Sequence, residues 1–223
     1  MSTPPHPGLA AVFPPLGLRI TVGDLELRPF ADADLPEYAA LLRRPIFADE
    51  SADHVFPWYA VDPDTRVLNA LRFQWTLRGA IRPESWTLTF GIRHRGRLIG
   101  SQDVVAQHFA RRRTVSTGSW LTLDAQGYGL GKLMRQAVLV LAFDHLGALR
   151  AETAAVQGNA PSQGVSRACG YRSDGTQVNL DGERVNIHDR FVLTPEDFVR
   201  PEETVSVDAF TPALRSLLGV AAA

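Results

Sequence analysis

The sequence of 223 residues has a single cysteine, Cys169, and no excess of either charge. One cysteine excludes a disulfide within the chain and a zinc site of four thiolates, and it suits a reducing compartment. Lys and Arg number 23 against 24 Asp and Glu, so the net charge of -1 supplies no field that would gather a polyanion. We therefore expect no nucleic-acid partner.

Long apolar runs are also lacking. No stretch approaches the ~20 apolar residues that span a bilayer, and residues 1–15 show no basic segment followed by an apolar one. The six histidines have no metal-ligand spacing, and the HExxH and G-x-S-x-G motifs are absent. The sequence predicts a cytoplasmic protein with no membrane partner and no metal, and it does not support a metalloprotease or an α/β-hydrolase.

Proline divides the chain into a lead-in and a folded body. Prolines crowd residues 1–17 and disfavour both helix and ladder, so this segment is expected to be extended. Residues 18–198 have the length of one domain. Residues 199–223 form a tail with one apolar stretch at 210–218, and three alternatives remain for it: docking on the body, docking on a second copy in a homodimer, or mobility.

Hydrophobic periodicity predicts both strands and helices in the body. The expected strands cover residues 18–21, 25–29, 86–92, 97–109, 113–123, 149–156, 171–180 and 183–193, the last two joined by an Asp181-Gly182 turn. The expected helices cover about ten residues after the capping Asp32 and Asp34, then 63–79, 130–147 and 160–168. The two strands that flank the 130–147 helix form a crossover unit and are expected to be parallel.

A glycine-rich turn, Gln126-Gly127-Tyr128-Gly129-Leu130-Gly131-Lys132, precedes the strongest expected helix. A helix N-terminus binds anions through unpaired N–H groups, and glycine lets a phosphate approach the backbone. A Walker A loop needs a glycine where Gln126 stands, and a Rossmann fingerprint needs one where Lys132 stands. The turn is neither of these, and it either holds a phosphate or pyrophosphate or only redirects the chain.

The pattern Gln126-x-x-Gly129-x-Gly131 resembles the acyl-CoA pyrophosphate loop of the GNAT N-acyltransferases. The branch that acylates ribosomal-protein N-termini, including its actinobacterial members, is similar in further motifs: Leu27-Arg28-Pro29, Phe56-Pro57-Trp58, Gly118-Ser119-Trp120-Leu121, Asn159-x-x-Ser162 and Cys169-Gly170-Tyr171. The resemblance covers residues 18–193. It implies an α/β fold with a mixed, largely antiparallel seven-stranded sheet that is splayed at its centre and flanked by helices.

The resemblance implies that acetyl-CoA or succinyl-CoA lies in the splay as the cosubstrate. The backbone of Leu121 and Leu123 then pairs with the pantetheine, and N–H groups near Trp120 and Leu121 polarise the thioester carbonyl. The N–H groups of residues 126–132 surround the pyrophosphate. The implied CoA-binding residues are Trp120, Leu121, Thr122, Leu123, Gln126, Gly127, Tyr128, Gly129, Leu130, Gly131, Lys132, Asn159, Ser162, Ser166 and Arg167.

The chain lacks the residues that usually serve as general acid and general base in the family. Many members carry a glutamate where Ser116 stands and a tyrosine where Ser166 stands. By the resemblance, Ser162 serves the leaving sulfur, although a serine there also caps a helix. Asp103 and Glu152 lie on expected strands beside the splay, and either is a candidate base or an exposed or ion-paired strand residue.

The absence of a strong base bears on the acceptor. At pH 7 a lysine-like amine with a pKa near 10.4 costs roughly 4 to 5 kcal/mol to deprotonate, whereas an α-amine near 8 costs about 1.4 kcal/mol. The sequence therefore favours an α-amine or another acceptor of low pKa. The acceptor wall is expected among Phe56, Trp58, Trp75 and Trp86, unless these aromatics only fill the core.

Cys169 stands where the family has a core leucine, which favours a buried apolar side chain over an acyl-accepting nucleophile. The sequence predicts an acyl-CoA-dependent N-acyltransferase that moves an acetyl or succinyl group by direct attack in a ternary complex. The acceptor is a primary amine of a protein N-terminus, a lysine or a small molecule. The alternative is a CoA-binding regulatory or scaffold protein that keeps the fold but has lost turnover.

Overall fold

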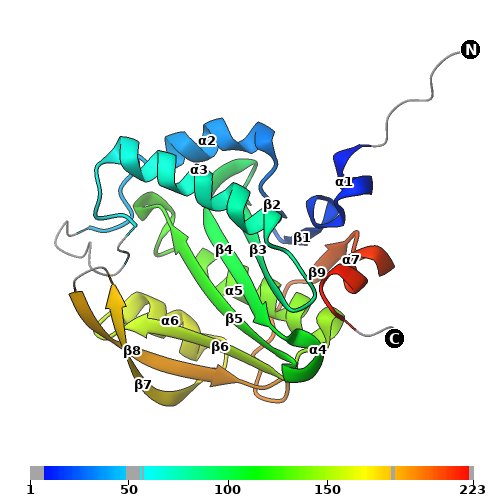
Figure 1. The fold of residues 1–223 in the computed structure, drawn as a ribbon. Coiled ribbons are helices and arrows are strands. Elements are labelled where there is room, and N and C mark those ends of the chain that lie inside the picture. Colours follow the sequence, from blue (N-terminus) through cyan, green and yellow to red (C-terminus); the bar gives the residue numbers. More distant parts are fainter. Residues whose placement is uncertain (1–7, 49–55, 57, 182–183, 221–223) are drawn as a thin grey trace, which may run out of the picture.

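The computed structural model describes residues 8–48, 56, 58–181 and 184–220. One mixed sheet runs through the molecule (Figure 1), and its strand order is β7-β8-β6-β5-β4-β3-β2-β1-β9. The strands are β1 (Arg19–Val22), β2 (Leu25–Pro29), β3 (Ser85–His94), β4 (Arg97–Gln107), β5 (Thr114–Leu121), β6 (Arg150–Val156), β7 (Arg172–Asp181), β8 (Arg184–Leu193) and β9 (Val205–Asp208).

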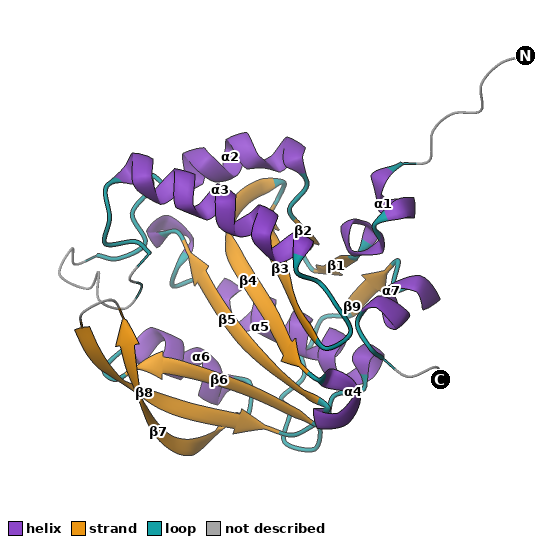
Figure 2. Cartoon of the chain, in the orientation of Figure 1, coloured by secondary structure: helices purple, strands orange, loops and turns teal. Residues whose placement is uncertain are grey.

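Helices cover both faces of the sheet (Figure 2). They are α1 (Leu9–Val12), α2 (Leu35–Leu41), α3 (Pro63–Gly79), α4 (Phe109–Arg112), α5 (Leu130–Val140), α6 (Ala160–Ala168) and α7 (Pro212–Leu217). Helices α2 and α3 lie side by side over β3 and β4, whereas α5 and α6 pack together on the other face. No helix in the described ranges is long and apolar enough to cross a membrane.

The periodicity of the sequence accounts for most of these elements. In β2, Leu25, Leu27 and Pro29 are buried and alternate with half-buried residues, as expected for a strand with one face on the core. Helix α3 begins after Asp62, whose side chain accepts hydrogen bonds from the backbone N–H groups of Asp64 and Thr65. The strand and helix positions predicted for the body are confirmed to within a few residues.

The crossover unit is also confirmed, because β5 and β6 are parallel neighbours. They pair only at Thr114 with Arg150, Val115 with Ala151, and Ser116 with Glu152. Strand β5 continues to Leu121 and β6 to Val156, but the two strands do not pair with each other beyond these residues, so they diverge. Strand β5 keeps an unshifted antiparallel register with β4 across the same residues, so the gap opens on its β6 side only.

The sheet has nine described strands, whereas the resemblance implied seven and the periodicity predicted eight. The strand that neither predicted, β9, comes from the tail. Strand β9 pairs antiparallel with β1 and extends the sheet at that edge. Leu214 and Leu218 are fully buried in the main core, and the Trp86 indole N–H donates to the Leu218 carbonyl at 2.9 Å. The tail therefore docks on the body of its own chain, and it is part of the domain rather than a separate segment.

The expectation of an extended lead-in is wrong for residues 9–17. Helix α1 is followed by a single 3-10 turn at Pro14–Gly17, which begins with two prolines. Proline is tolerated in the first turn of a helix because the N–H groups there have no intrahelical partner. Residues 1–7, like Gly182 of the Asp181-Gly182 turn, lie outside the described residues.

Candidate active site

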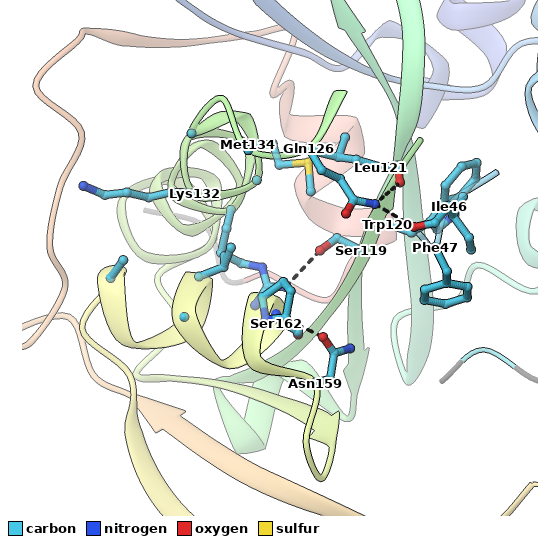
Figure 3. A pocket seen from close by; sticks show the side chains of 18 of the residues that line it. Ile46, Phe47, Ser119, Trp120, Leu121, Gln126, Lys132, Met134, Asn159 and Ser162 are labelled. Carbon is cyan, nitrogen blue, oxygen red and sulfur yellow. Dashed lines mark hydrogen bonds between the residues drawn. The ribbon is translucent and has the colours of Figure 1, made fainter. Parts of the chain in front are cut away.

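A cavity of about 430 Å³ opens where β5 and β6 diverge. The end of β5, the glycine-rich turn and the first turns of α5 and α6 surround it, and Figure 3 shows Ser162 and Asn159 of α6 facing Ser119 and Gln126 across it. Ile46 and Phe47 close it on the side of the α2–α3 connection. We call this space the donor cavity.

The glycine-rich turn presents free backbone donors at the mouth of the donor cavity. Gly127 and Gly129 have φ values of 84° and 78°, a left-handed conformation that glycine adopts without strain. Within the described chain, the N–H groups of residues 127–131 have no hydrogen-bond partner. The N–H groups of Gln126 and Lys132 are bonded to Leu123 O and Gly129 O, so five of the seven expected backbone donors remain for an anion.

The side chain of Gln126 closes the turn against the cavity wall. Its amide group donates to Ile46 O at 2.8 Å and to Leu121 O at 2.9 Å. The Leu123 N–H is bonded to Pro45 O, and the fully buried Thr122 donates its N–H to Ile99 O. The expected pairing of pantetheine with Leu123, and the expected contact with Thr122, therefore do not fit this geometry.

Alternate residues of β5 direct their backbone groups into the gap. The Thr117 carbonyl accepts a 2.9 Å hydrogen bond from the Thr153 hydroxyl of β6. Because N–H and C=O groups alternate sides along a strand, Ser119 and Leu121 face β6 like Thr117, whereas Trp120 faces β4. A strand edge for the pantetheine is thus present at Ser119 and at the Leu121 N–H, while the Leu121 carbonyl already accepts a hydrogen bond from the Gln126 side chain.

Helix α6 supplies the facing wall. The Asn159 side chain accepts the Ser162 N–H at 3.2 Å and so caps the helix, while both residues line the donor cavity. Ser166 is buried and donates its hydroxyl to Ser162 O, so it holds the helix and does not line the cavity. Arg167 also lies outside the cavity lining and donates to the Gln163 side chain.

A buried arginine of α5 reaches the gap, and the sequence reasoning missed it. Arg135 is 2% exposed and lines the donor cavity. Its guanidinium donates to Ser119 Oγ at 3.0 Å, to Thr153 Oγ1 at 3.3 Å and, more weakly, to Gln102 Oε1 at 3.5 Å. No carboxylate among the described residues pairs with this guanidinium, although a buried charge ordinarily has an opposite partner.

A second cavity, of about 460 Å³, lies on the face of the sheet that α2 and α3 cover. Its walls are largely aromatic and its floor is formed by β3, β4 and β5. The lining residues are Tyr38, Phe56, Trp58, Arg66, Asn69, Ala70, Phe73, Gln74, Thr89, Ser101, Asp103, Gly118, Ser119 and Trp120. It shares Phe56, Ser119 and Trp120 with the donor cavity, and we call it the acceptor cavity.

Asp103 is the acidic residue of the acceptor cavity. Its Oδ1 atom is buried and has no hydrogen-bond partner among the described residues. Burial raises the pKa of Asp103 to about 6, and the Thr89 hydroxyl nearby only partly opposes the shift. Asp103 is the cross-strand neighbour of Gly118, one residue from the Ser119 that borders both cavities.

A second buried arginine organises the acceptor wall. Arg66 of α3 donates to Leu42 O at 2.9 Å and to the carbonyls of Tyr59 and Val61 at 2.6 and 3.1 Å. Its guanidinium also lies 3.7 Å from the centre of the Tyr59 ring. These contacts fix the segment that carries Trp58, whose ring centre is 5.4 Å from that of Trp120.

Of the residues predicted for catalysis or for the acceptor wall, three lie outside both cavities. Glu152 lines neither cavity and is paired with Arg150 at 2.7 Å, which matches its alternative reading as an ion-paired strand residue. Trp75 is 52% exposed, because α3 turns its Arg66, Asn69, Ala70, Phe73 and Gln74 toward the cavity. Trp86 is a core residue that packs on Phe109 and binds the tail.

Cys169 is fully buried, and burial raises the pKa of its thiol to about 11, as a core position requires. In the part of the chain that the structure describes, no group of three or more His, Cys, Asp or Glu residues is arranged to hold a metal ion.

The split sheet thus places five free backbone N–H groups at the donor cavity, and the adjoining acceptor cavity encloses one carboxylate. The family model for the acetyltransferase (GNAT) domain matches residues 24–172, well over half of the chain. The chain therefore belongs to the GNAT acetyltransferase family, and the activity class is N-acetyl transfer from an acyl-CoA.

Solved structures share this fold. Mycobacterium smegmatis RimJ in complex with a CoA disulfide has a TM-score of 0.64 and 19% identity, over 82% of this chain and 88% of that one. A putative ribosomal-protein-serine acetyltransferase from Vibrio cholerae has a TM-score of 0.61 and 21% identity, over 79% and 97%. RimL, a ribosomal L7/L12 α-N-protein acetyltransferase in complex with coenzyme A, has a TM-score of 0.61 and 17% identity, over 79% and 97%.

Proposed function

We propose that the protein transfers an acetyl or succinyl group from coenzyme A to a primary amine by direct attack in a ternary complex. The observation that carries this proposal is the shared wall of the two cavities at Phe56, Ser119 and Trp120. A thioester in the donor cavity and an amine in the acceptor cavity meet at that wall. Both substrates are then bound together, and no acyl-enzyme is needed.

The donor is held by backbone groups. The free N–H groups of residues 127–131 bind the pyrophosphate, and the edge of β5 at Ser119 and Leu121 pairs with the pantetheine amides. Each hydrogen bond to a charged group contributes about 1.5 to 3 kcal/mol, so a few of them support micromolar affinity after the ordering cost. Asn159 supports this arrangement from α6.

The chemistry assigns a role to each of two side chains. Asp103 takes a proton from the ammonium group, the neutral nitrogen attacks the thioester carbon, and the C–N bond forms. N–H groups at the β5 edge stabilise the oxyanion, and the C–S bond breaks as the carbonyl re-forms. The Ser162 hydroxyl relays the remaining excess proton from the nitrogen to the departing sulfur, and Asp103 returns its proton to solvent. The products are an amide and the free thiol of coenzyme A.

The pKa of Asp103 favours an acceptor of low pKa. Moving a proton to a carboxyl group of pKa about 6 costs roughly 3 kcal/mol from an α-amine near 8, and roughly 6 kcal/mol from a lysine near 10.4. An α-amine or a comparable small-molecule amine is therefore the better acceptor. The α-amine of a ribosomal protein, for which the structural neighbour RimL is named, belongs to this class.

Arg135 supports succinyl-CoA over acetyl-CoA as the donor. Its guanidinium donates to Ser119, the residue that borders both cavities, so its charge lies beside the acyl position. A carboxylate on the acyl group supplies the negative partner that this buried cation has in no described residue. Charge-assisted hydrogen bonds of this kind are worth about 1.5 to 3 kcal/mol, or roughly 10- to 150-fold in rate.

One variant tests the donor assignment. Arg135→Met removes the charge and keeps the length of the side chain, so kcat/KM with succinyl-CoA is expected to fall roughly 10- to 100-fold while the value with acetyl-CoA changes less than about threefold. Equal losses with both donors mean that Arg135 only positions Ser119, and that succinyl-CoA is not selected by this residue.

The activity itself is tested by thiol release and by labelling. Lys132 is the only lysine in the sequence, so an amine-reactive reagent has one lysine side chain to modify. Bound acyl-CoA is expected to protect Lys132, which lines the donor cavity, and an amine is expected to trigger release of the CoA thiol. Protection without thiol release above the uncatalysed rate supports a CoA-binding regulatory or scaffold protein instead, and no protection contradicts the donor site.

A further inference from the structure

The acceptor cavity has a composition that selects a particular kind of amine. Five aromatic rings line it, from Tyr38, Phe56, Trp58, Phe73 and Trp120. The ring centres of Trp58 lie 5.7 Å from Phe56 and 5.4 Å from Trp120, and Tyr38 lies 6.4 Å from Trp120. Faces and edges of such rings pack against apolar or aromatic groups and stabilise a neighbouring cation.

Two of the described residues that line the acceptor cavity carry a charge. Asp103 is the one acidic residue among the described lining residues, and its Oδ1 atom is buried without a hydrogen-bond partner. Arg66 is the one basic residue among them. Its Nη atoms donate to the carbonyls of Leu42, Tyr59 and Val61, and its Nε has no partner among the described residues. Among the described lining residues, Asp103 is therefore the single negative group open to a ligand, and it is enclosed by rings.

The position of Asp103 fixes which end of the ligand carries the charge. Asp103 is paired across the strands with Gly118, next to Ser119 and Trp120, where the two cavities join. The helix α3 residues Asn69, Ala70 and Phe73 line the part of the wall that α3 forms. A ligand with its ammonium at Asp103 places its nitrogen at the junction and its body between Trp58 and α3.

We infer that the acceptor is a monocationic primary amine that carries an aromatic or bulky apolar group. This inference rests on the proposed acyl transfer and names the class of its second substrate. A polyamine fits less well, because its second charge finds no acidic partner among the described lining residues. A short polar amine also fits less well, because it leaves the space between the aromatic side chains unfilled.

Two kinds of molecule carry a primary amine with an aromatic group: a free arylalkylamine, and a peptide whose first residue is aromatic. With a saturating acyl-CoA, we expect kcat/KM for 2-phenylethylamine to exceed that for ethylamine by about 100-fold, since each buried methylene alone discriminates roughly 10- to 200-fold. Spermidine is expected to react no better than ethylamine. A Phe-Ala dipeptide amide compared with an Ala-Ala dipeptide amide shows whether a peptide N-terminus also enters.

Matched variants keep the test specific to the cavity. Trp58→Ala is expected to reduce the preference for 2-phenylethylamine at least tenfold, whereas Trp75→Ala, which removes an exposed tryptophan outside the cavity, leaves it unchanged. Ala70→Phe, which fills the cavity, is expected to abolish acylation of 2-phenylethylamine and spare ethylamine. Rates for ethylamine or spermidine within threefold of 2-phenylethylamine overturn the inference, as do equal losses in the two tryptophan variants.

A binding measurement separates this inference from the proposed function. If no amine releases thiol, quenching of tryptophan fluorescence by 2-phenylethylamine still reports on Trp58 and Trp120. If the quenching saturates with a Kd at least 30-fold lower than that for ethylamine, and is lost in Trp58→Ala, the inferred class of ligand is supported even though the transfer reaction fails. Absence of saturable quenching overturns the ligand class.

Discussion

Replacing Asp103 by Asn makes the protein less active and more stable at the same time. The amide cannot take a proton from the acceptor, and a positioned general base contributes about 10²- to 10⁴-fold. We therefore expect kcat/KM for the amine to fall by at least about 100-fold at pH 7.5. The KM for acyl-CoA is expected to stay within twofold, because Asp103 does not line the donor cavity.

The stability change follows from the raised pKa of the Asp103 carboxyl group. Its folded value of about 6 lies above the unfolded value near 3.9, so the folded state binds the proton more tightly between these two values. The cost of ionised Asp103 is absent below pH 4 and fully present above pH 6, where it amounts to about 3 kcal/mol. Asp103→Asn is expected to remove most of this cost and to raise Tm by about 5–10 °C at pH 7.5.

The assay combines thiol release and thermal unfolding across pH 4 to 8. In the wild type the activity is expected to rise with pH through about 6, and in the variant this limb disappears. Glu152→Gln is the matched control, since Glu152 is also acidic and on a central strand but is paired with Arg150 outside both cavities. The reasoning fails if Asp103→Asn keeps kcat/KM within threefold, or if it lowers Tm at pH 7.5.

Three further variants address other parts of the structure. Gly129→Ala places a side chain at a φ of 78°, which costs about 1 to 2 kcal/mol, so the Kd for CoA measured by calorimetry is expected to rise roughly 5- to 30-fold. Arg66→Met frees the carbonyls of Tyr59 and Val61, and the KM for the amine is expected to rise about tenfold while the Kd for CoA is unchanged. Leu214→Ala opens a cavity under the docked tail and is expected to cost about 2 to 5 kcal/mol in urea unfolding, with kcat/KM unchanged at 20 °C.

Local patterns predicted the elements well, because capping and periodicity act over a few residues. Helix α3 begins and ends where Asp62-Pro63 and Gly79 indicate, and alternation from Trp86 to Ile92 marks β3. The buried face of α3 was harder to predict from the sequence, because Arg66 and Gln74 are its buried side chains while Trp75 is exposed. A polar side chain that binds main-chain carbonyls can be buried against the hydrophobic pattern.

The key polar residues of the site were harder to place from the sequence. Asp103 and Glu152 are both acidic residues on expected strands, but Glu152 pairs with Arg150, two residues earlier on β6, whereas no basic side chain among the described residues pairs with Asp103. Arg135 left one signal that was overlooked: from Met134 to Val140 all residues except Arg135 and Gln136 are apolar, and a run of this kind extends around the helix and favours burial of the polar residues within it. Strand β9 has four residues, too few for a periodicity, and its partner β1 lies near the other end of the sequence.

The divergence of β5 and β6 also has a mechanical meaning. Six strands, from β9 to β5, form one block of the sheet, and β6, β8 and β7 form another, yet the ladder between the blocks has only three residue pairs. A donor that hydrogen-bonds along the free edge of β5 and contacts α6 acts as a cross-link between the blocks. Occupancy of the gap is then expected to merge two cooperative units into one, which native-state hydrogen exchange reports as slower opening of β6 and β8.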